Sequence, residues 1–303
     1  MSKKRPTNIG ASVRQRLLSQ ARTDKRTFSE LLQYFAMDRF LYRMSISDYA
    51  DSFILKGALM LQAWKSPVFR PTMDIDMLAH RTSNEISEIE GVIRNICTTA
   101  VEPDGLDFDQ QSLQGERIVE EADYEGVRVT FFGKLDTARI RMQIDIGFGD
   151  VIYPSPQHTE MPTILDFPPA IINAYSLESA IAEKFEAMIK LDALNSRMKD
   201  FYDIWLLSRQ FNFSNKDLQK AIDLTLHNRK TELPEELTPF SDKFIIDKTA
   251  QWNAFSKKMK IDAVPVEFSE IVHHIEKFLD PAISGIRSQS DSNLQWEAPG
   301  PWK

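Results

Sequence analysis

The sequence lacks the features that define several large classes of protein. Its 303 residues include a single cysteine, Cys97, which excludes an internal disulfide framework and a zinc site built from cysteines. Its uncharged apolar runs are far shorter than the roughly 20 residues that a membrane span needs. No apolar block follows the basic residues at the N-terminus, so we expect no secretory signal. These absences favour a cytoplasmic protein without membrane contact.

Several common catalytic motifs are also missing. The sequence contains no G-x-x-x-x-G-K phosphate loop, no G-x-G-x-x-G dinucleotide motif, no H-E-x-x-H metal motif and no G-x-S-x-G nucleophile motif. Two adjacent histidines, His273 and His274, lie in a predicted helix and therefore face different directions, which is poor geometry for sharing a metal. Carboxylates are left as the main candidates for chemistry.

The charge is unevenly distributed along the chain. The net charge is −7, yet residues 1–26 hold eight basic side chains and one acidic side chain, so the other 277 residues carry −14. A basic segment on an acidic body is suited to contact with a phosphate backbone or an acidic partner. The alternative is a solvated amphipathic helix.

The hydrophobic pattern predicts three successive regions and an α+β fold. Apolar residues at helical spacing predict helices over 11–23 and 27–43, the second after a capping sequence at Thr27–Glu30. Short runs rich in Val, Ile and Phe then predict a small mixed sheet, with a hairpin turn at Glu125-Gly126. The predicted elements of this region are strands over 72–78, 117–124, 127–132 and 138–148 and a helix over 84–99.

The last part of the chain is predicted to be helical. The expected helices cover 176–194, 197–210, 215–226, 248–259 and 266–279. The tail from Ser284 is rich in Ser, Gly and Pro, which predicts poor order. We therefore expect a helical lead-in at 1–50, an α/β core at 51–170, a helical domain at 171–283 and a disordered tail at 284–303.

The most informative residues are aspartates on two predicted strands. Alternate side chains of a strand share one face, which groups Thr72, Asp74 and Asp76 on the first strand, and Asp145 lies on the polar face of the second. Three such carboxylates repel one another unless a cation compensates them, and their oxygens suit Mg²⁺ or Mn²⁺. A metal held there could support phosphoryl or nucleotidyl transfer. The alternative is a solvated, exposed sheet face, since D-x-D alone is a common pattern.

The segment before these aspartates is suited to binding phosphate. It reads FILKGALML from Phe53, an apolar strand followed by Gly57 and the start of a helix. Glycine lets a triphosphate approach the backbone, and a helix N-terminus favours an anion. The candidate nucleotide-binding residues here are Lys56, Gly57, Ala58 and Thr72.

With these motifs in register, the sequence resembles the AbiEii/AbiGii-type nucleotidyltransferase toxins of the polymerase-β-like superfamily. The resemblance covers most of residues 10–210, and its motifs, in the family's order, read FILKGALML, RPTMDIDM, QIDIGFGD, ESAIAEKFEAM and RMKDFYDIW. The family usually has Gly or Ser after the glycine of the first motif. Here Ala58 stands at that position, which removes a possible hydroxyl contact to phosphate.

The resemblance also implies roles for residues of the helical region. The family's EK-containing helix supplies an essential lysine, which corresponds to Lys184 and would bind the triphosphate; the alternative is a surface lysine. One aspartate of KDFYDIW would complete the site, with Asp200 our first choice and Asp203 our second. The alternative for Asp200 is a carboxylate that favours the dipole at a helix N-terminus.

As a whole, the resemblance implies a metal-dependent nucleotidyltransferase toxin of a type IV-like toxin–antitoxin or abortive-infection system, with a role in phage defence or growth control. Such an enzyme would use Mg²⁺ or Mn²⁺ to transfer NMP from an NTP to an acceptor, by analogy an RNA such as the 3′ end of tRNA, and would have a cognate antitoxin. Two alternatives stay open. One is a non-catalytic nucleotide-binding or assembly protein on the same scaffold, and the other is a transferase that modifies a protein hydroxyl.

Overall fold

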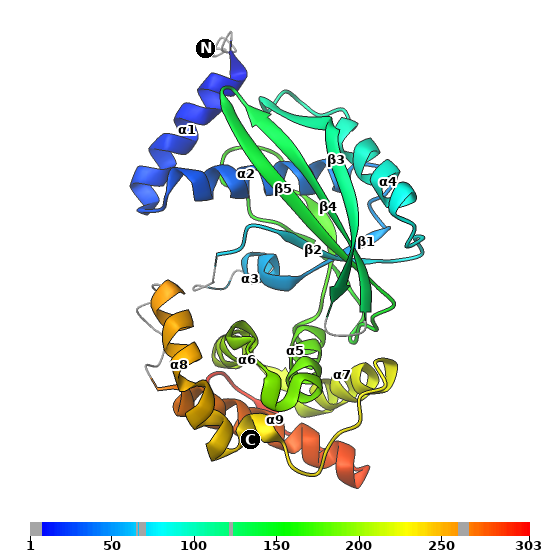
Figure 1. Cartoon of the computed structure of the whole chain (residues 1–303), viewed down its shortest axis with the longest axis vertical. Coiled ribbons are helices and arrows are strands. Elements are labelled where there is room, and N and C mark those ends of the chain that lie inside the picture. The colour runs from blue at the N-terminus through cyan, green and yellow to red at the C-terminus, as the bar shows by residue number, and fades with distance from the viewer. Residues whose placement is uncertain (1–7, 65, 67–70, 121–123, 260–266) are drawn as a thin grey trace. The chain divides into compact units, whose positions relative to one another are not determined.

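The computed structural model describes residues 8–64, 66, 71–120, 124–259 and 267–303 (Figure 1). The chain forms two compact units. Unit 1 comprises Met1–Gly149 with Gln157–Ala174, and unit 2 comprises Asp150–Pro156 with Tyr175–Lys303. Unit 1 holds a mixed sheet and unit 2 is largely helical, so the predicted α+β class is confirmed.

Unit 1 is built on a seven-stranded sheet in the order β3-β4-β5-β2-β1-β7-β6. Strand β2 pairs in parallel with β5 and antiparallel with β1, which places it inside the sheet with a neighbour on each side. The strands are β1 (Phe53–Lys56), β2 (Ile75–Ala79), β3 (Leu106–Glu120), β4 (Tyr124–Leu135), β5 (Ala138–Phe148), β6 (Gln157–Glu160) and β7 (Ile171–Ala174).

Two long N-terminal helices of unit 1 match the predicted ones. The side chain of Asn8 caps α1 (Ile9–Asp24), and that of Thr27 accepts from the Glu30 N–H at the start of α2 (Phe28–Ser45), as the capping sequence predicts. Helix α2 packs against the sheet through aromatic residues of its buried face, with the rings of Phe40 and Phe131 5.8 Å apart. The short α3 (Met60–Ala63) and α4 (Ile86–Thr98) complete the helices described in this unit.

The predicted hairpin turn at Glu125-Gly126 is wrong. Both residues lie within β4 and pair with Val119 and Ile118 of β3, and the chain reverses between the paired residues Glu120 and Tyr124. The connecting residues 121–123 lie outside the described chain. A Cβ on Gly126 would lie 3.0 Å from the Ile118 side chain and 3.1 Å from the Ile146 carbonyl oxygen. Close packing inside the sheet favours glycine at this position, rather than a turn.

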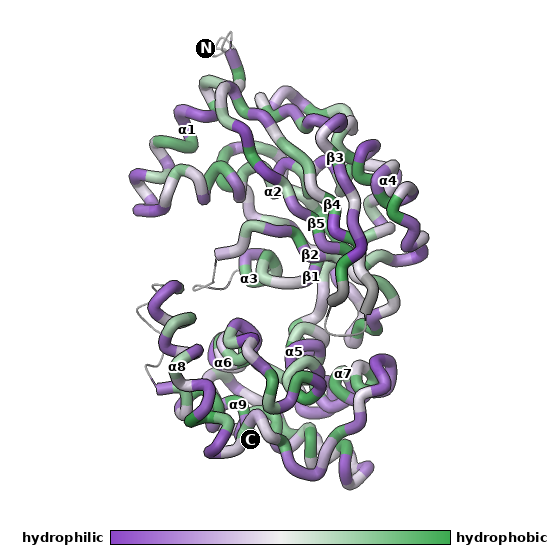
Figure 2. Tube along the Cα trace, in the orientation of Figure 1, coloured by the Kyte–Doolittle hydropathy of each residue, from purple (hydrophilic) through white to green (hydrophobic). Residues whose placement is uncertain are grey.

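Unit 2 contains helices α5 (Leu177–Leu191), α6 (Met198–Gln210), α7 (Asn215–Asn228), α8 (Asp242–Met259) and α9 (Phe268–Ser288). Helices α5, α6 and α7 agree with the predicted ones, whereas α8 begins at Asp242 rather than at 248. Residue 266, where the last helix was expected to begin, lies outside the described chain. Hydrophobic and hydrophilic residues alternate along the helices (Figure 2), as expected for helices that each bury one face. Across the described ranges, no helix is both long and apolar enough to span a membrane.

The C-terminal segment differs from the poor order that its composition predicts. Helix α9 continues through Pro281 to Ser288, and Gln295–Trp296 form β9, which pairs with β8 (Phe213–Ser214). Trp296 is buried, its ring lies 5.0 Å from that of Phe278, and its indole N–H donates to the Ser208 carbonyl oxygen at 2.5 Å. Two tryptophans, Trp296 and Trp302, supply apolar area that the Ser, Gly and Pro content of the segment conceals.

Candidate functional site

The sheet of unit 1 brings together the three aspartates that the sequence singles out. Asp76 on β2 lies directly beside Asp145 on the neighbouring parallel strand β5, and Asp74 immediately precedes β2. One carboxylate oxygen from each residue lies within 4.8 Å of the others. Asp145 is buried, whereas Asp74 and Asp76 are partly exposed. We call Asp74, Asp76 and Asp145 the acidic cluster.

The strand that was predicted to carry both Asp74 and Asp76 begins later than predicted. It starts at Ile75, so Thr72 and Asp74 precede it. The Thr72 N–H donates to the Tyr34 hydroxyl at 3.0 Å instead of to a neighbouring strand. The Thr72 hydroxyl donates to the Asp74 carboxylate. Thr72 therefore still contacts the acidic cluster, through a bent segment rather than through a shared strand face.

The predicted phosphate-binding segment lies beside Asp76. Lys56 is paired with Asp76 in the antiparallel register of β1 and β2, and the next residue, Gly57, has a positive φ of 72°. A Cβ at Gly57 would overlap the Asp76 carboxylate, so only glycine fits this position. The Ala58 side chain is buried. The turn therefore places backbone next to the Asp76 carboxylate.

One part of the phosphate-binding argument does not hold. The glycine opens a 3₁₀ turn, Gly57–Leu59, and the α-helix that follows, α3, has four residues. A helix of this length has few aligned peptide dipoles, because the macrodipole sums over successive peptide units. We therefore assign no dipole contribution to this turn.

Arg128 is a member of the site that the sequence analysis missed. It lies on β4 directly across from Asp145, and its guanidinium forms two hydrogen bonds with that carboxylate, Nε to Oδ1 at 2.8 Å and Nη2 to Oδ2 at 2.7 Å. Hydrogen bonding to Asp145, the largest cause, raises the pKa of Arg128, and the charges of Asp145 and Asp74 act in the same direction. Arg128 compensates part of the cluster's negative charge.

The donor set of the acidic cluster fits a hard divalent cation. All three candidate ligands are carboxylates, the type of ligand that Mg²⁺ and Mn²⁺ prefer. The absent Cβ of Gly57 leaves backbone in direct contact with Asp76. Because Arg128 occupies both oxygens of Asp145, an ion bound by all three aspartates would compete with this guanidinium.

The predicted residues of unit 2 form a separate network. The Lys184 ammonium on α5 lies 3.0 Å from Asp203 and 3.4 Å from Asp200, both on α6. Arg197, the first residue of the RMKDFYDIW motif, binds Asp200 at 2.6 Å. Asp200 is fully buried and Asp203 nearly so. Lys184 thus contacts both candidate aspartates, and we call these four residues the lysine–aspartate network.

Comparison with known families decides the class of this chain. The model of the family described as nucleotidyl transferase AbiEii toxin, type IV TA system, matches residues 39–280. The chain belongs to this family. As an AbiEii protein it is a nucleotidyltransferase of the toxin class, and membership of a type IV toxin–antitoxin family implies an NTP substrate and an antitoxin partner.

Comparisons with individual proteins are less informative. A crystal structure of a candidate nucleotidyltransferase from H. pylori is 12% identical, with a TM-score of 0.49, over 88% of this chain and 100% of that one. The crystal structure of JHP933 from Helicobacter pylori is 13% identical, with the same TM-score, over 87% of this chain and 95% of that one. A search of curated protein sequences finds no match.

Proposed function

We propose that this AbiEii protein is a metal-dependent toxin that transfers NMP from an NTP to an RNA, with the 3′ end of tRNA as the first acceptor to test. The observation that carries the proposal is the acidic cluster, three carboxylates gathered by neighbouring strands in a chain of the nucleotidyltransferase family. Carboxylate clusters of this kind hold the cations of phosphoryl-transfer enzymes.

Each candidate residue then has a role. Asp74, Asp76 and Asp145 would hold Mg²⁺ or Mn²⁺, and the backbone at Lys56, Gly57 and Ala58, with Thr72, would receive the phosphates beside them. Lys184 would bind the triphosphate as a point charge. Asp200 completes this assignment, with Asp203 as the second choice, and the contacts of both with Lys184 are compatible with either.

The reaction is a displacement at the α-phosphorus of the NTP. The acceptor hydroxyl oxygen forms the new bond to phosphorus, the bond to the bridging oxygen breaks, and pyrophosphate leaves with that electron pair while the hydroxyl proton is released. The bound cation would favour attack by the hydroxyl and stabilise the charge on the leaving pyrophosphate.

The uneven charge of the chain supports RNA as the acceptor. Eight basic side chains lie in the segment 1–26, of which residues 1–7 are outside the described chain. On α1 and just after it, Arg22 and Lys25 are exposed, whereas Arg16 pairs with Asp166 and Arg26 with Glu30. Exposed cations of this kind can contact a phosphate backbone.

The test is incubation with each α-labelled NTP, Mg²⁺ or Mn²⁺, and purified tRNA, total RNA or total protein, followed by gel analysis. We expect label in RNA and a loss of more than about 100-fold in Asp76→Asn, because removing a metal ligand should cost more than removing the groups that support it. Asp48→Asn is the matched control, since Asp48 is an exposed carboxylate of unit 1 that is not part of the acidic cluster.

Each other outcome contradicts a stated part of the proposal. Label in protein would replace the RNA acceptor with a protein hydroxyl. NTP binding without any labelled product would favour the non-catalytic alternative. Equal activity of Asp76→Asn and wild type would remove the metal role of the acidic cluster.

A further inference from the structure

The three aspartates of the acidic cluster are not held in place by the same means. Asp76 and Asp145 lie within strands, and their backbone is fixed by pairing with neighbours. Asp74 precedes Ile75, the first paired residue of β2. A residue outside the ladder needs other contacts to fix its position, and metal ligands must be held to within fractions of an ångström.

Gln33 of α2 supplies one of these contacts. Its side-chain amide donates one hydrogen bond to the carbonyl oxygen of Met73, the residue before Asp74, and another to that of Arg141 on β5, both at 3.0 Å. Gln33 is 5% exposed. The amide therefore ties the segment that carries Asp74 to the strand that carries Asp145, by two partly buried hydrogen bonds from a buried side chain.

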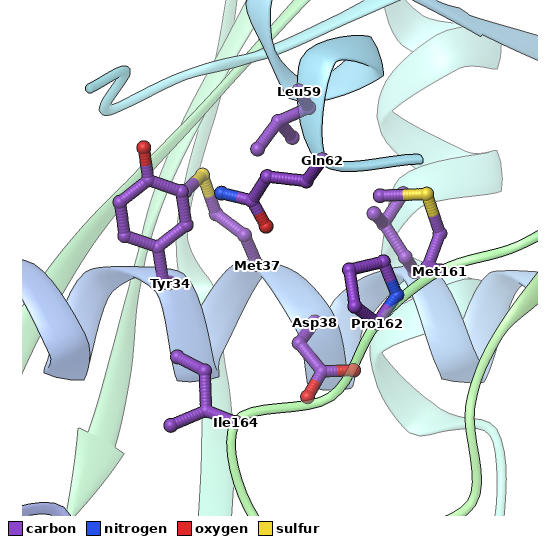
Figure 3. Close-up of a pocket in the computed structure, with 9 residues that line it drawn as sticks. Tyr34, Met37, Asp38, Leu59, Gln62, Met161, Pro162 and Ile164 are labelled. Carbon is purple, nitrogen blue, oxygen red and sulfur yellow. The ribbon is translucent and has the colours of Figure 1, made fainter. Parts of the chain in front are cut away.

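Tyr34, the next residue of α2, supplies the second contact. Its hydroxyl accepts from the Thr72 N–H, and the Thr72 hydroxyl in turn donates to the Asp74 carboxylate. Figure 3 shows the ring extending from α2 beside a small pocket that it lines with Met37 and Gln62. Tyr34 is 3% exposed, so its orientation is fixed by packing.

We infer that Gln33 and Tyr34 are positioning residues that hold Asp74 in the acidic cluster. Both act through backbone atoms of 72–73 and, for Tyr34, also through the Thr72 hydroxyl. The inference rests on the proposed function, because it assumes that the acidic cluster binds a divalent cation. It adds α2, a helix outside the motifs of the site, to the machinery that shapes the cluster.

The test measures binding of Mn²⁺ alone to the full chain, by the electron paramagnetic resonance signal of the free ion. In Gln33→Met the amide is lost at similar side-chain length, and we expect about 10-fold or more weaker Mn²⁺ binding, as for other groups that orient metal ligands. Tyr34→Phe keeps the ring and loses only the hydroxyl, so we expect a smaller weakening. The matched control is Tyr42→Phe on the same helix, where the ring contacts Arg39 instead, and it should bind Mn²⁺ like wild type.

The free energy of unfolding of each variant is measured alongside Mn²⁺ affinity. A lower free energy of unfolding with unchanged Mn²⁺ affinity in both variants would overturn the inference, because it would reduce Gln33 and Tyr34 to structural residues. If Gln33→Met fails to fold, the comparison of Tyr34→Phe with Tyr42→Phe decides. Asp76→Asn separates the two proposals: if it binds Mn²⁺ as tightly as wild type, the proposed function fails, and if it does not, the inference stands or falls on the α2 variants.

Discussion

Arg128 compensates part of the negative charge of the acidic cluster through its contact with Asp145. Its guanidinium binds both oxygens of Asp145, which also receive longer hydrogen bonds from the Gln143 amide. Three neighbouring carboxylates repel one another, and the Arg128 guanidinium offsets part of that repulsion. A divalent cation would provide the same compensation, so Arg128 and the metal compete for Asp145.

Replacing Arg128 by Met should therefore change the response of the protein to metal. Without metal, we expect a lower melting temperature, because Asp145 loses the guanidinium that binds both of its oxygens. With Mn²⁺ added, we expect a larger rise in melting temperature than in wild type, because the ion no longer displaces a guanidinium. Thermal unfolding with and without Mn²⁺ measures both effects.

The control for this comparison is Arg139→Met. Arg139 lies on β5 like Asp145, but its guanidinium stacks on the Phe132 ring, 3.5 Å from the ring centroid. This variant should show the wild-type rise with Mn²⁺. An equal rise in Arg128→Met and wild type would mean that Asp145 keeps its arginine when the metal binds.

The sequence predicts the carboxylates but not the residues that hold them. Asp74 and Asp76 stand out because a two-residue spacing is visible along the chain. The pairing of Arg128 with Asp145 depends on strand register, which joins positions 17 residues apart and leaves no local pattern. Gln33 did leave a signal: it is a polar residue within the apolar run Leu31–Phe35 of α2, and a polar group there needs buried partners.

At the scale of whole elements, α5 and α6 are joined by the lysine–aspartate network. Asp200 has Lys184 and Arg197 as partners. The Lys184 ammonium is closer to the Asp203 carboxylate than to the Asp200 carboxylate. Removing one partner of a buried ion pair is strongly destabilising, because it leaves a buried charge with less compensation. Lys184 therefore has two candidate roles. One is to stabilise the fold by compensating Asp200 and Asp203, and the other is the proposed contact with the triphosphate.

Two variants separate these roles. Lys184→Met should lower the free energy of unfolding by about 3–5 kcal/mol. Lys184→Met combined with Asp203→Asn should recover most of that loss, because the second change neutralises the carboxylate. If Lys184 also binds the triphosphate, the double variant is stable but binds NTP more weakly than Asp203→Asn alone, as measured by calorimetry.

The exposed Lys199 of α6 provides the control, since Lys199→Met removes an equal charge and should affect neither measurement. Wild-type NTP affinity in the double variant would leave Lys184 with a structural role only. That result would not affect the metal role of the acidic cluster, which different variants test.

Element prediction from sequence succeeds where the periodicity is long and fails where tertiary contacts decide. The helices α2, α5 and α6 follow from apolar residues at helical spacing. In β4, Gly126 looks like a turn residue, and only the neighbouring Ile118 side chain shows why it lies within a strand. For the C-terminal segment, composition predicts poor order. In the structure, Trp296 packs against Phe278 and donates a hydrogen bond to the carbonyl oxygen of Ser208, which lies 88 residues earlier in the sequence.

At the scale of the whole molecule, each compact unit contains a titratable group whose pKa is shifted by burial, and the contributions of the two groups to stability depend on pH in opposite directions. In unit 1, burial raises the pKa of Asp38 to about 6, although the neighbouring Arg39 acts to lower it. In unit 2, burial together with the charges of Arg209 and Lys277 lowers the pKa of His274 to about 4. Both groups are therefore neutral over part of the pH range in which they would be charged in the unfolded chain.

The signs of the two contributions follow from linkage. The folded state binds the Asp38 proton more tightly than the unfolded state, so this contribution to stability is full below pH 4 and is lost as the pH rises through 6. The folded state binds a proton on His274 less tightly than the unfolded state does. Its contribution is therefore present above pH 6.5 and is lost as the pH falls through 4.

Asp38→Asn and His274→Gln should accordingly change stability at different pH values, which denaturant unfolding at pH 4, 5.5 and 7.5 measures. The asparagine keeps an acceptor for Arg39 but carries no charge, so we expect Asp38→Asn to be about 1–3 kcal/mol more stable relative to wild type at pH 7.5 than at pH 4. For His274→Gln, stability relative to wild type should instead improve as the pH falls from 7.5 to 4, because the variant has no imidazole to protonate on unfolding.

The two units can be followed by different probes. Four of the five tryptophans, at positions 205, 252, 296 and 302, belong to unit 2, so tryptophan fluorescence mainly follows the unfolding of that unit. Hydrogen exchange in α2 peptides follows the unfolding of unit 1. A difference between Asp38→Asn and wild type that is the same at pH 4 and pH 7.5 would mean that the Asp38 carboxyl has the same pKa in the folded and unfolded chain.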